Sequence, residues 1–230
     1  MEALESPALF ETLIQKGELK QLVYRNTCEA FAMFGRVVSN LIADYRTFRN
    51  DRNTAIGIET SGLGEFGFEL KFAGDILVFY MHTNVFEFSR DHEVMRSMYI
   101  REDKERSYCG VIHVYNFLAD SFRYNRDNDL GYLIGRIFIN KDDHYFIEGK
   151  RELGQIYNSF DTSVFDDDAA ALIVKSAMLY TIHFDLLSPP YDEVKVVTVA
   201  AMKNAFESMK IVTGKRLGFR FQADSNDPVR

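Results

Sequence analysis

Residues 64–73 read GEFGFELKFA, and this stretch decides the fold because apolar residues occupy every second position. A strand places alternate side chains on opposite faces, so this pattern predicts one face turned toward a core and one toward water. The inward face carries four apolar side chains: Phe66, Phe68, Leu70 and Phe72. The opposite face carries Glu69 and Lys71, which pose the main catalytic question of the chain.

The neighbouring residues extend this strand into an antiparallel meander. Residues 55–60 form a candidate strand before it, and Gly74-Asp75 is a candidate two-residue hairpin turn after it. Residues 76–83 are apolar on both faces, which predicts a central strand that is covered on both sides. Residues 84–89 either extend that strand or begin another one.

More strands are predicted further along the chain. Residues 132–150, YLIGRIFINKDDHYFIEGK, form the strongest hairpin pattern in the sequence. Residues 90–107 are expected to form a polar connector with a helical turn. Residues 108–125 are ambiguous, because the first half fits a strand and the second half fits a helix. Residues 215–223 alternate apolar and polar side chains, which predicts a half-exposed strand.

The N-terminal residues show helical periodicity. Ser6 and Pro7 are typical of a helix start, and Gly17 is expected to end a first short helix. A second apolar stripe runs over residues 18–51, which corresponds to roughly 50 Å of helix at about 1.5 Å per residue. That length predicts either a break near Asn26-Thr27 or pairing of one part with a second copy of the chain.

Later helices are predicted from their ends. Residues 151–165 are expected to form a short helix and a loop. Three aspartates at 166–168 precede an apolar stretch that reaches residue 187, where Ser188-Pro189-Pro190 stops the helix. Residues 191–212 fit a helix or a strand, and their three- and four-residue spacing favours the helix.

Together these elements predict an α+β fold with an antiparallel sheet, a meander plus a hairpin, flanked by helices. The sequence contains no internal repeat and no low-complexity linker. We therefore expect a single domain over residues 1–230, with an N-terminal helical segment over about 6–51 and a sheet-containing body over about 54–223.

Composition excludes several classes of protein. The net charge of −7 argues against nucleic acid as a partner, because phosphate-binding proteins carry basic surfaces. The N-terminus does not resemble a signal peptide, and no uncharged apolar run reaches about 18 residues, so we expect no membrane span and a cytoplasmic location. Cys28 and Cys109 fit two reduced thiols, with one disulfide as the alternative.

One motif has a catalytic interpretation. In nucleases of the PD-(D/E)xK type, acids on neighbouring strands hold a divalent cation beside a lysine, and Glu59, Glu69 and Lys71 supply these residue types. In that fold a helix follows the acid-x-Lys strand, whereas a tight hairpin follows here. We therefore favour the alternative that these side chains line the solvated face with cross-strand partners.

The remaining polar residues give weaker candidates. The five histidines, His82, His92, His113, His144 and His183, lack metal-site spacing, so we expect no metal and no cofactor. His82 and His183 are expected to be hydrogen-bonded core residues, and His144 to be exposed. Two groups of arginines are candidates for binding an anionic partner: Arg46, Arg49 and Arg52, and Arg216 and Arg220.

Residues 128–154, NDLGYLIGRIFINKDDHYFIEGKRELG, resemble segments of conserved proteins of unknown function from Bacteroides-like bacteria. The resemblance covers about a tenth of the chain. It implies a bacterial, cytoplasmic origin, and it implies neither an activity nor any site residue.

Three functions are consistent with these observations. The first is a non-catalytic module that self-associates through its N-terminal helices or binds a protein or small-molecule partner. The second is a metal-dependent phosphodiesterase or nuclease that uses Glu59, Glu69 and Lys71. The third is a small-ligand sensor whose aromatic strands line a pocket. The absence of a full catalytic constellation favours the first.

Overall fold

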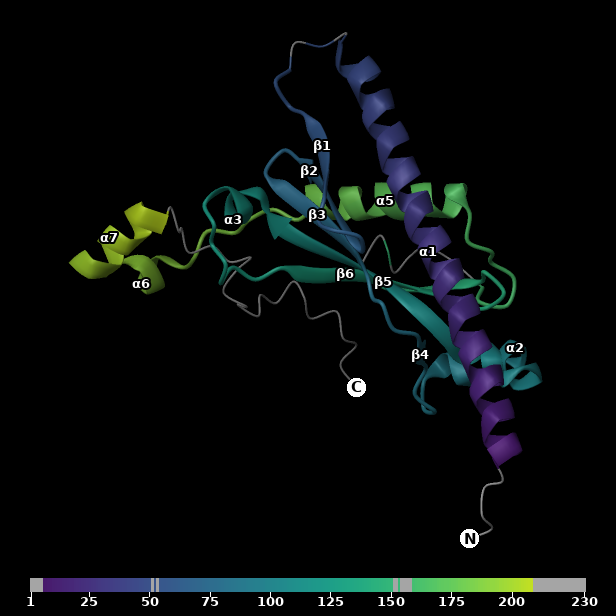
Figure 1. Cartoon of the computed structure of the whole chain (residues 1–230). Helices are drawn as coiled ribbons and strands as arrows, with labels where there is room; N and C mark the ends of the chain where they lie inside the picture. The colour runs from purple at the N-terminus through teal and green to yellow at the C-terminus, as the bar shows by residue number, and fades with distance from the viewer. Residues whose placement is uncertain (1–5, 51, 53, 151–152, 154–158, 209–230) are drawn as a thin grey trace, which may run out of the picture.

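A computed structural model of the chain describes residues 6–50, 52, 54–150, 153 and 159–208. A twisted antiparallel sheet lies at its centre, and the long helix α1 crosses one face of that sheet beside helix α5 (Figure 1). The described residues therefore form an α+β structure with an antiparallel sheet and flanking helices, as the sequence predicted.

The sheet has seven strands, and every pairing is antiparallel. Six strands follow the order β1-β2-β3-β5-β6-β7, and β4 pairs with β5 beside this path. The two meanders, β1 to β3 and β5 to β7, are joined where β3 pairs with β5. The strands are β1 Ile58–Gly62, β2 Gly67–Phe72, β3 Asp75–Met81, β4 Phe86–Glu87, β5 Tyr108–Leu118, β6 Tyr132–Ile139 and β7 Tyr145–Gly149.

The alternating strand β2 faces inward as predicted. Leu70 and Phe72 are buried, and the Phe68 ring stacks on Phe79 of β3 with centroids 4.8 Å apart. The prediction of the following turn was wrong by one residue: Phe72 pairs with Asp75, so the turn residues are Ala73 and Gly74. Ala73 takes a left-handed φ of 47°, which alanine adopts only rarely.

Two further strand predictions need correction. The first strand is β1 at Ile58–Gly62, not residues 55–60, so it begins and ends later than predicted. The central strand ends at Met81, and its side away from the helices is closed at Ile76, which is 2% exposed, but open further along. Tyr80, on that same side of β3, is 41% exposed.

Helix α1 runs without interruption over Ser6–Asn50, and its 45 residues span about 68 Å. The predicted end at Gly17 and the predicted break near Asn26-Thr27 are both wrong. A glycine inside a helix costs only about 1 kcal/mol, and burial of Leu19 and Val23 just beyond it offsets that cost.

Of the polar pair in the middle of α1, Asn26 has partners outside the helix, whereas Thr27 bonds within it and contacts the sheet. The Asn26 side-chain amide donates to the backbone carbonyls of Asn140 and Lys141 at 3.2 and 3.0 Å. The Thr27 hydroxyl donates to the Val23 carbonyl at 2.7 Å. Thr27 also lies against Gly110, where an added Cβ would fall 2.0 Å from its oxygen, so glycine permits this close approach of α1 to β5.

Helix α5, Asp167–Ile182, begins where the aspartates predicted. Asp166 caps it by accepting a hydrogen bond from the Ala169 backbone N–H at 2.8 Å. The helix ends before the predicted stop at Ser188. It packs beside α1, and both helices bury an apolar face against the sheet in one core, which includes Phe34, Val38, Leu77, Phe79, Ile112, Ile137, Ile173 and Ala177.

The segment between β3 and β5 covers part of the other face of the sheet. It contains the short helices η1 Glu93–Arg96, α2 Met98–Glu102 and η2 Lys104–Ser107. A second cluster forms under it and includes Val94, Tyr99, Ile100, Cys109, Val111, Phe138 and Phe160. Burial raises the pKa of the Cys109 thiol, and both cysteines are free.

The ambiguous segments resolve in different ways. Strand β5 occupies Tyr108–Leu118 and helix α3 follows at Ala119–Arg123, as the two halves of that segment predicted. Within 191–212 the described part is helical, with α6 Tyr191–Val194 and α7 Val199–Ser208. The predicted strand at 215–223 and most of 151–165 lie outside the described residues. None of the described helices carries a stretch long and apolar enough to cross a membrane.

Candidate functional site: the outer face of the sheet

The face of the sheet that points away from α1 and α5, called the outer face here, divides into two halves. One half is closed by the segment between β3 and β5. The other half carries aromatic and charged side chains on β3, β5, β6 and β7. Tyr80 and Leu133 in this second half are 41% and 39% exposed, so the described residues leave it open.

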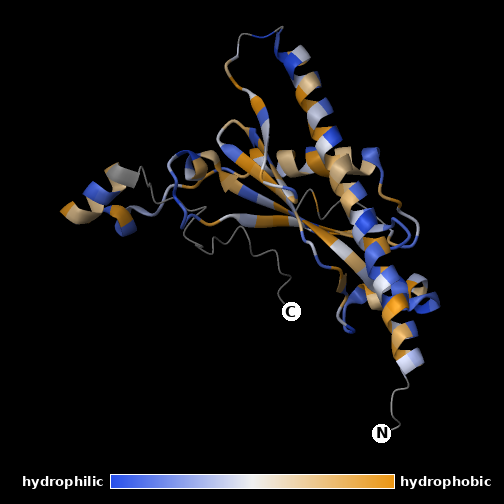
Figure 2. Cartoon of the chain, viewed as in Figure 1, coloured by the Kyte–Doolittle hydropathy of each residue, from blue (hydrophilic) through white to orange (hydrophobic). Residues whose placement is uncertain are grey.

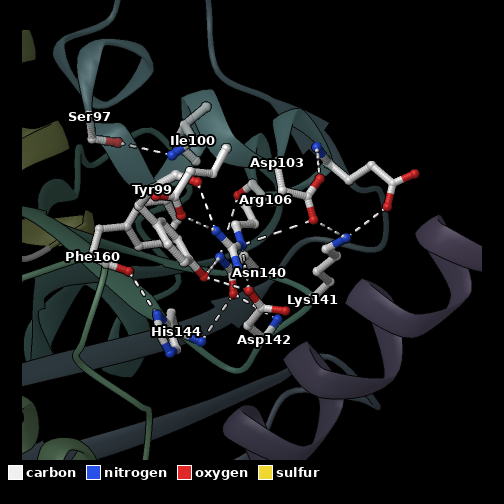
Figure 3. Close-up of polar contacts among 12 residues, drawn as sticks. Ser97, Tyr99, Ile100, Asp103, Arg106, Asn140, Lys141, Asp142, His144 and Phe160 are labelled. Atoms are coloured by element: carbon white, nitrogen blue, oxygen red, sulfur yellow. Dashed lines mark hydrogen bonds and ion pairs between the residues drawn. The ribbon is translucent and has the colours of Figure 1, made fainter.

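The closed half is fastened by a polar cluster (Figure 3). The Tyr99 hydroxyl of α2 donates to Asp142 at 2.8 Å and accepts from the Asn140 amide at 2.9 Å. Arg106 of η2 donates from Nε to the same Asp142 carboxylate at 2.9 Å. Its guanidinium also lies over the Tyr99 ring, 4.3 Å from the centroid.

The hairpin between β6 and β7 is held by the same cluster. The Asn140 side-chain oxygen accepts from the backbone N–H groups of Asp142 and His144 at 2.9 and 3.0 Å. The His144 ring stacks on Tyr99 at 5.1 Å and bonds the Phe160 carbonyl through Nδ1 at 3.0 Å. His144 is half-buried, so the prediction that it is exposed was wrong.

The polar groups of this cluster form hydrogen bonds with one another and with the protein backbone. Burial raises the pKa of Tyr99, which keeps its hydroxyl protonated and able to donate. The hydrogen bond from Lys141 lowers the pKa of Asp103, which keeps this ion pair charged. The cluster therefore anchors the β3–β5 segment to the hairpin. Its donors and acceptors are largely paired within the protein, so few of them can bind a ligand.

The open half carries a line of rings, called the ring row here: Tyr80, His113 and Tyr115. Strand register places Tyr80 of β3 directly across from His113 of β5. Their ring centroids are 6.1 Å apart with planes 27° from parallel, and His113 lies 5.9 Å from Tyr115 at 23°. The three rings are therefore stacked on one another, and Tyr80 is the exposed member of the row.

A charged group borders the ring row. Arg136 of β6 lies directly across from His113 on one side and from Glu148 of β7 on the other. Glu148 accepts a hydrogen bond from Arg136 and also contacts His92 Nε2 at 3.0 Å. A hollow of about 270 Å³ is lined there by Leu133, Ile134, Gly135, Arg136, Glu148, Gly149 and Lys150.

His113 is the polar centre of this surface. Its Nδ1 is buried and has no hydrogen-bond partner among the described residues. Burial lowers the pKa of His113, and the nearby Arg136 and His82 lower it further. The imidazole is therefore neutral at physiological pH, and it offers one donor and one acceptor.

The predicted catalytic residues lie on the same outer face, toward the β1 edge. Glu59 pairs across from Lys71, and Glu69 accepts a hydrogen bond from the Ser61 hydroxyl at 2.7 Å. The register sets Glu59 and Glu69 two residues out of line, on a diagonal of about 7–8 Å. Within the described ranges, no group of three His, Cys, Asp or Glu side chains is placed to hold a metal ion.

The predicted arginines do not form one site. Arg52 lies over the Phe48 ring at 3.6 Å and donates to the Phe48 carbonyl. Arg46 lines a hollow of about 440 Å³ between α1 and β1 together with Glu59. Arg49 is half-buried at the end of α1. Arg216 and Arg220 lie outside the described residues.

Two histidine predictions were wrong in position. His82 lies half-buried at the edge of the ring row, where its Nδ1 accepts from the Asn84 backbone N–H at 3.0 Å. His183 is exposed just after α5. Sequence reasoning missed the ring row, because its members meet only through the pairing of β3 with β5. The available signal was the repeat of His113, Tyr115 and Phe117 at every second position.

A comparison of the chain with protein-family models, with curated proteins and with solved structures found no match.

Proposed function

We propose that this protein is a non-catalytic module that self-associates through the N-terminal end of α1. Residues 6–15, called the arm here, extend beyond the sheet, and all of them are exposed (Figure 1). The arm carries a stripe of four large apolar side chains that are 51–67% exposed: Leu9, Phe10, Leu13 and Ile14. This exposed stripe is the observation that carries the proposal.

The stripe does not continue the face of α1 that covers the sheet. At 3.6 residues per turn, its centre lies about 130° around the helix from the face that buries Leu19, Val23 and Ala30. Figure 2 shows hydrophobic residues at this free end of the helix. An apolar stripe that faces away from the body of the protein is suited to contact with a second molecule.

The arm leaves the body at one defined place. Lys16 lies over the Tyr108 ring, 3.7 Å from the centroid, and donates to the Tyr108 hydroxyl. That hydroxyl donates in turn to Glu87 of β4 at 2.8 Å. Residues before Lys16 have no such contact with the sheet among the described residues, so they project as a free helix.

A second copy of the chain is the occupant that this stripe fits. Two identical stripes of Leu, Ile and Phe are self-complementary and bring no unpaired charge to their centre. Four such side chains present about 400–500 Å², which is roughly half of the ~800 Å² per partner in a standard interface. We therefore expect a concentration-dependent dimer rather than a permanent one.

Size-exclusion chromatography with light scattering tests the proposal. We expect the measured mass to rise from the 26.6 kDa of one chain toward that of two as the concentration increases. Leu13→Glu places a charge in the stripe and should give a monomer at every concentration, because burial of an unpaired charge is strongly unfavourable.

Phe206→Glu on α7 is the matched control. Phe206 is 72% exposed, and it lies on a helix far from the arm along the chain. This variant should associate like the unmodified protein. A monomer at all concentrations, or equal association of Leu13→Glu and the unmodified chain, would overturn the proposal.

A further inference from the structure

We propose that the ring row binds a planar aromatic carboxylate, whose ring packs against the exposed Tyr80 over His113 and whose carboxylate pairs with Arg136. This site lies on the opposite side of the sheet from α1. It is therefore independent of self-association through the arm.

The aromatic part of the ligand is argued from the rings. The ring planes of neighbouring residues in the row are nearly parallel. The angle is 27° between Tyr80 and His113 and 23° between His113 and Tyr115. The Tyr80 ring is 41% exposed, so a flat ligand can reach this surface. Offset stacking of aromatic rings is favourable beyond the area that it buries.

The carboxylate of the ligand is suggested by hydrogen-bond donors of Arg136, Tyr80 and Tyr115 that are not engaged by other described residues. Arg136 has five N–H donors and is 42% exposed as a side chain, and among the described residues its hydrogen-bond partner is the single acceptor Glu148. The hydroxyls of Tyr80 and Tyr115 have no hydrogen-bond partner within the described part of the chain. A carboxylate supplies acceptors to such donors, and arginine binds it with two parallel hydrogen bonds.

The charges around the hollow favour an anion over a cation, and the other acid that borders the row, Glu69, lies across from Val78 beside Tyr115. Lys150 lines the hollow beside Arg136, and His82 and His92 add no negative charge. Glu148, the acid of this group, is shared between Arg136 and His92. A cationic ligand would meet Arg136 and Lys150 as like charges, whereas an anionic ligand pairs with both.

Three probes of similar shape separate these contributions: 2-naphthoate, its saturated decahydro analogue, and 2-naphthylmethylammonium. Each is titrated into the full chain while the backbone amides and the His113 imidazole are followed by NMR. For 2-naphthoate we expect saturable binding with a dissociation constant of about 1 mM or tighter. Ring-current shifts should concentrate on His113 and its strand neighbours. The other two probes should bind at least about tenfold more weakly.

Matched variants locate the carboxylate. Arg136→Gln should weaken 2-naphthoate binding at least about tenfold, because it removes a charged hydrogen bond. Arg136→Lys keeps the charge and should lose less. Arg36→Gln is the control, since Arg36 pairs with Asp167 at 3.0 Å on the helical face and should leave binding unchanged. Leu13→Glu in the arm should also leave it unchanged.

Several results would overturn this inference. One is the lack of any His113 shift with 2-naphthoate in the unmodified chain, which needs no variant to fold. Another is equal binding of the three probes, which would indicate an unspecific apolar surface. A third is unchanged affinity of a folded Arg136→Gln variant, or shifts that concentrate on the arm or on the hollow beside Arg46.

Discussion

The middle of α1 and its N-terminal arm belong to one unbroken helix, yet the apolar side chains of the middle are buried and those of the arm are exposed. Residues 19–42 bury a continuous face against the sheet and α5, with Phe34 and Val38 at 0% and 1% exposure. The arm carries side chains of the same kind, but Leu13 is 67% exposed. Apolar composition alone therefore does not mark the core, because the partner surface must also be present in the same chain.

An apolar helical stripe can therefore either pack within the same chain or remain exposed. In the middle segment, the apolar face, Asn26 and Thr27 all match features of the sheet and of the β6–β7 hairpin. In the arm the stripe is turned away from that face and matches nothing in the described part of the chain. The predictions below test this contrast through stability, where the middle should respond and the arm should not.

The largest effect is expected from truncating matched phenylalanines. Phe34 packs against the rings of Phe79 and Phe165 with centroids 5.4 and 5.3 Å away, so Phe34→Ala should lower the free energy of unfolding by about 3–5 kcal/mol. Phe10→Ala should change it by less than about 0.5 kcal/mol in dilute protein. Urea denaturation measures both, and equal losses would contradict the assignment of the arm as free.

A smaller effect is expected from matched asparagines on the same helix. Asn26→Ala removes the side-chain donor that the carbonyls of Asn140 and Lys141 share, so it should cost about 1–3 kcal/mol of unfolding free energy. Asn40→Ala, at an exposed position of α1, should cost less than about 0.5 kcal/mol. A neutral Asn26→Ala variant would show that α1 is not anchored to the hairpin through this side chain.

The smallest effect lies on the side of the sheet that α1 does not cover. Burial lowers the pKa of His113 in the folded chain below its usual value of 6.5. The unfolded chain therefore binds more protons as pH falls, so stability is present above about pH 6.5 and declines below it.

This pH effect can be isolated by a second pair of variants. Replacement of His113 by Gln should flatten the decline in unfolding free energy between about pH 7 and pH 5. His183→Gln, beyond the end of α5, should leave it as it is. A decline that keeps its slope in the His113→Gln chain would contradict burial of a neutral imidazole in the ring row.

Local patterns predicted much of the fold. The alternation of Phe68, Leu70 and Phe72, the cap at Asp166 and the β6–β7 hairpin are all set by residues close in sequence, and the structure confirms them. The predictions of helix breaks at Gly17 and Asn26-Thr27 were wrong for a different reason. The groups that stabilise α1 there come from β5 and the β6–β7 hairpin, more than 80 residues away, and no local rule contains them.

The candidate sites were harder to predict for the same reason. Tyr80, His113 and Arg136 lie on three strands, and only the register of β3, β5 and β6 places them in one row. The intervening segment, residues 82–107, gives no signal of that register. The apolar length over residues 18–51 was visible in sequence and suggested pairing with a second copy, but that stripe is buried against the sheet, and the exposed stripe lies before it.

Isotope-filtered NOE spectroscopy on a mixture of labelled and unlabelled chains tests the central claim most directly, because it reports contacts between copies without any substitution. We predict intermolecular NOEs to the methyl groups of Leu9, Leu13 and Ile14, and none to core methyls such as those of Leu70 and Leu77. A concentrated sample without intermolecular NOEs, or with NOEs only at residues outside the arm, would contradict it.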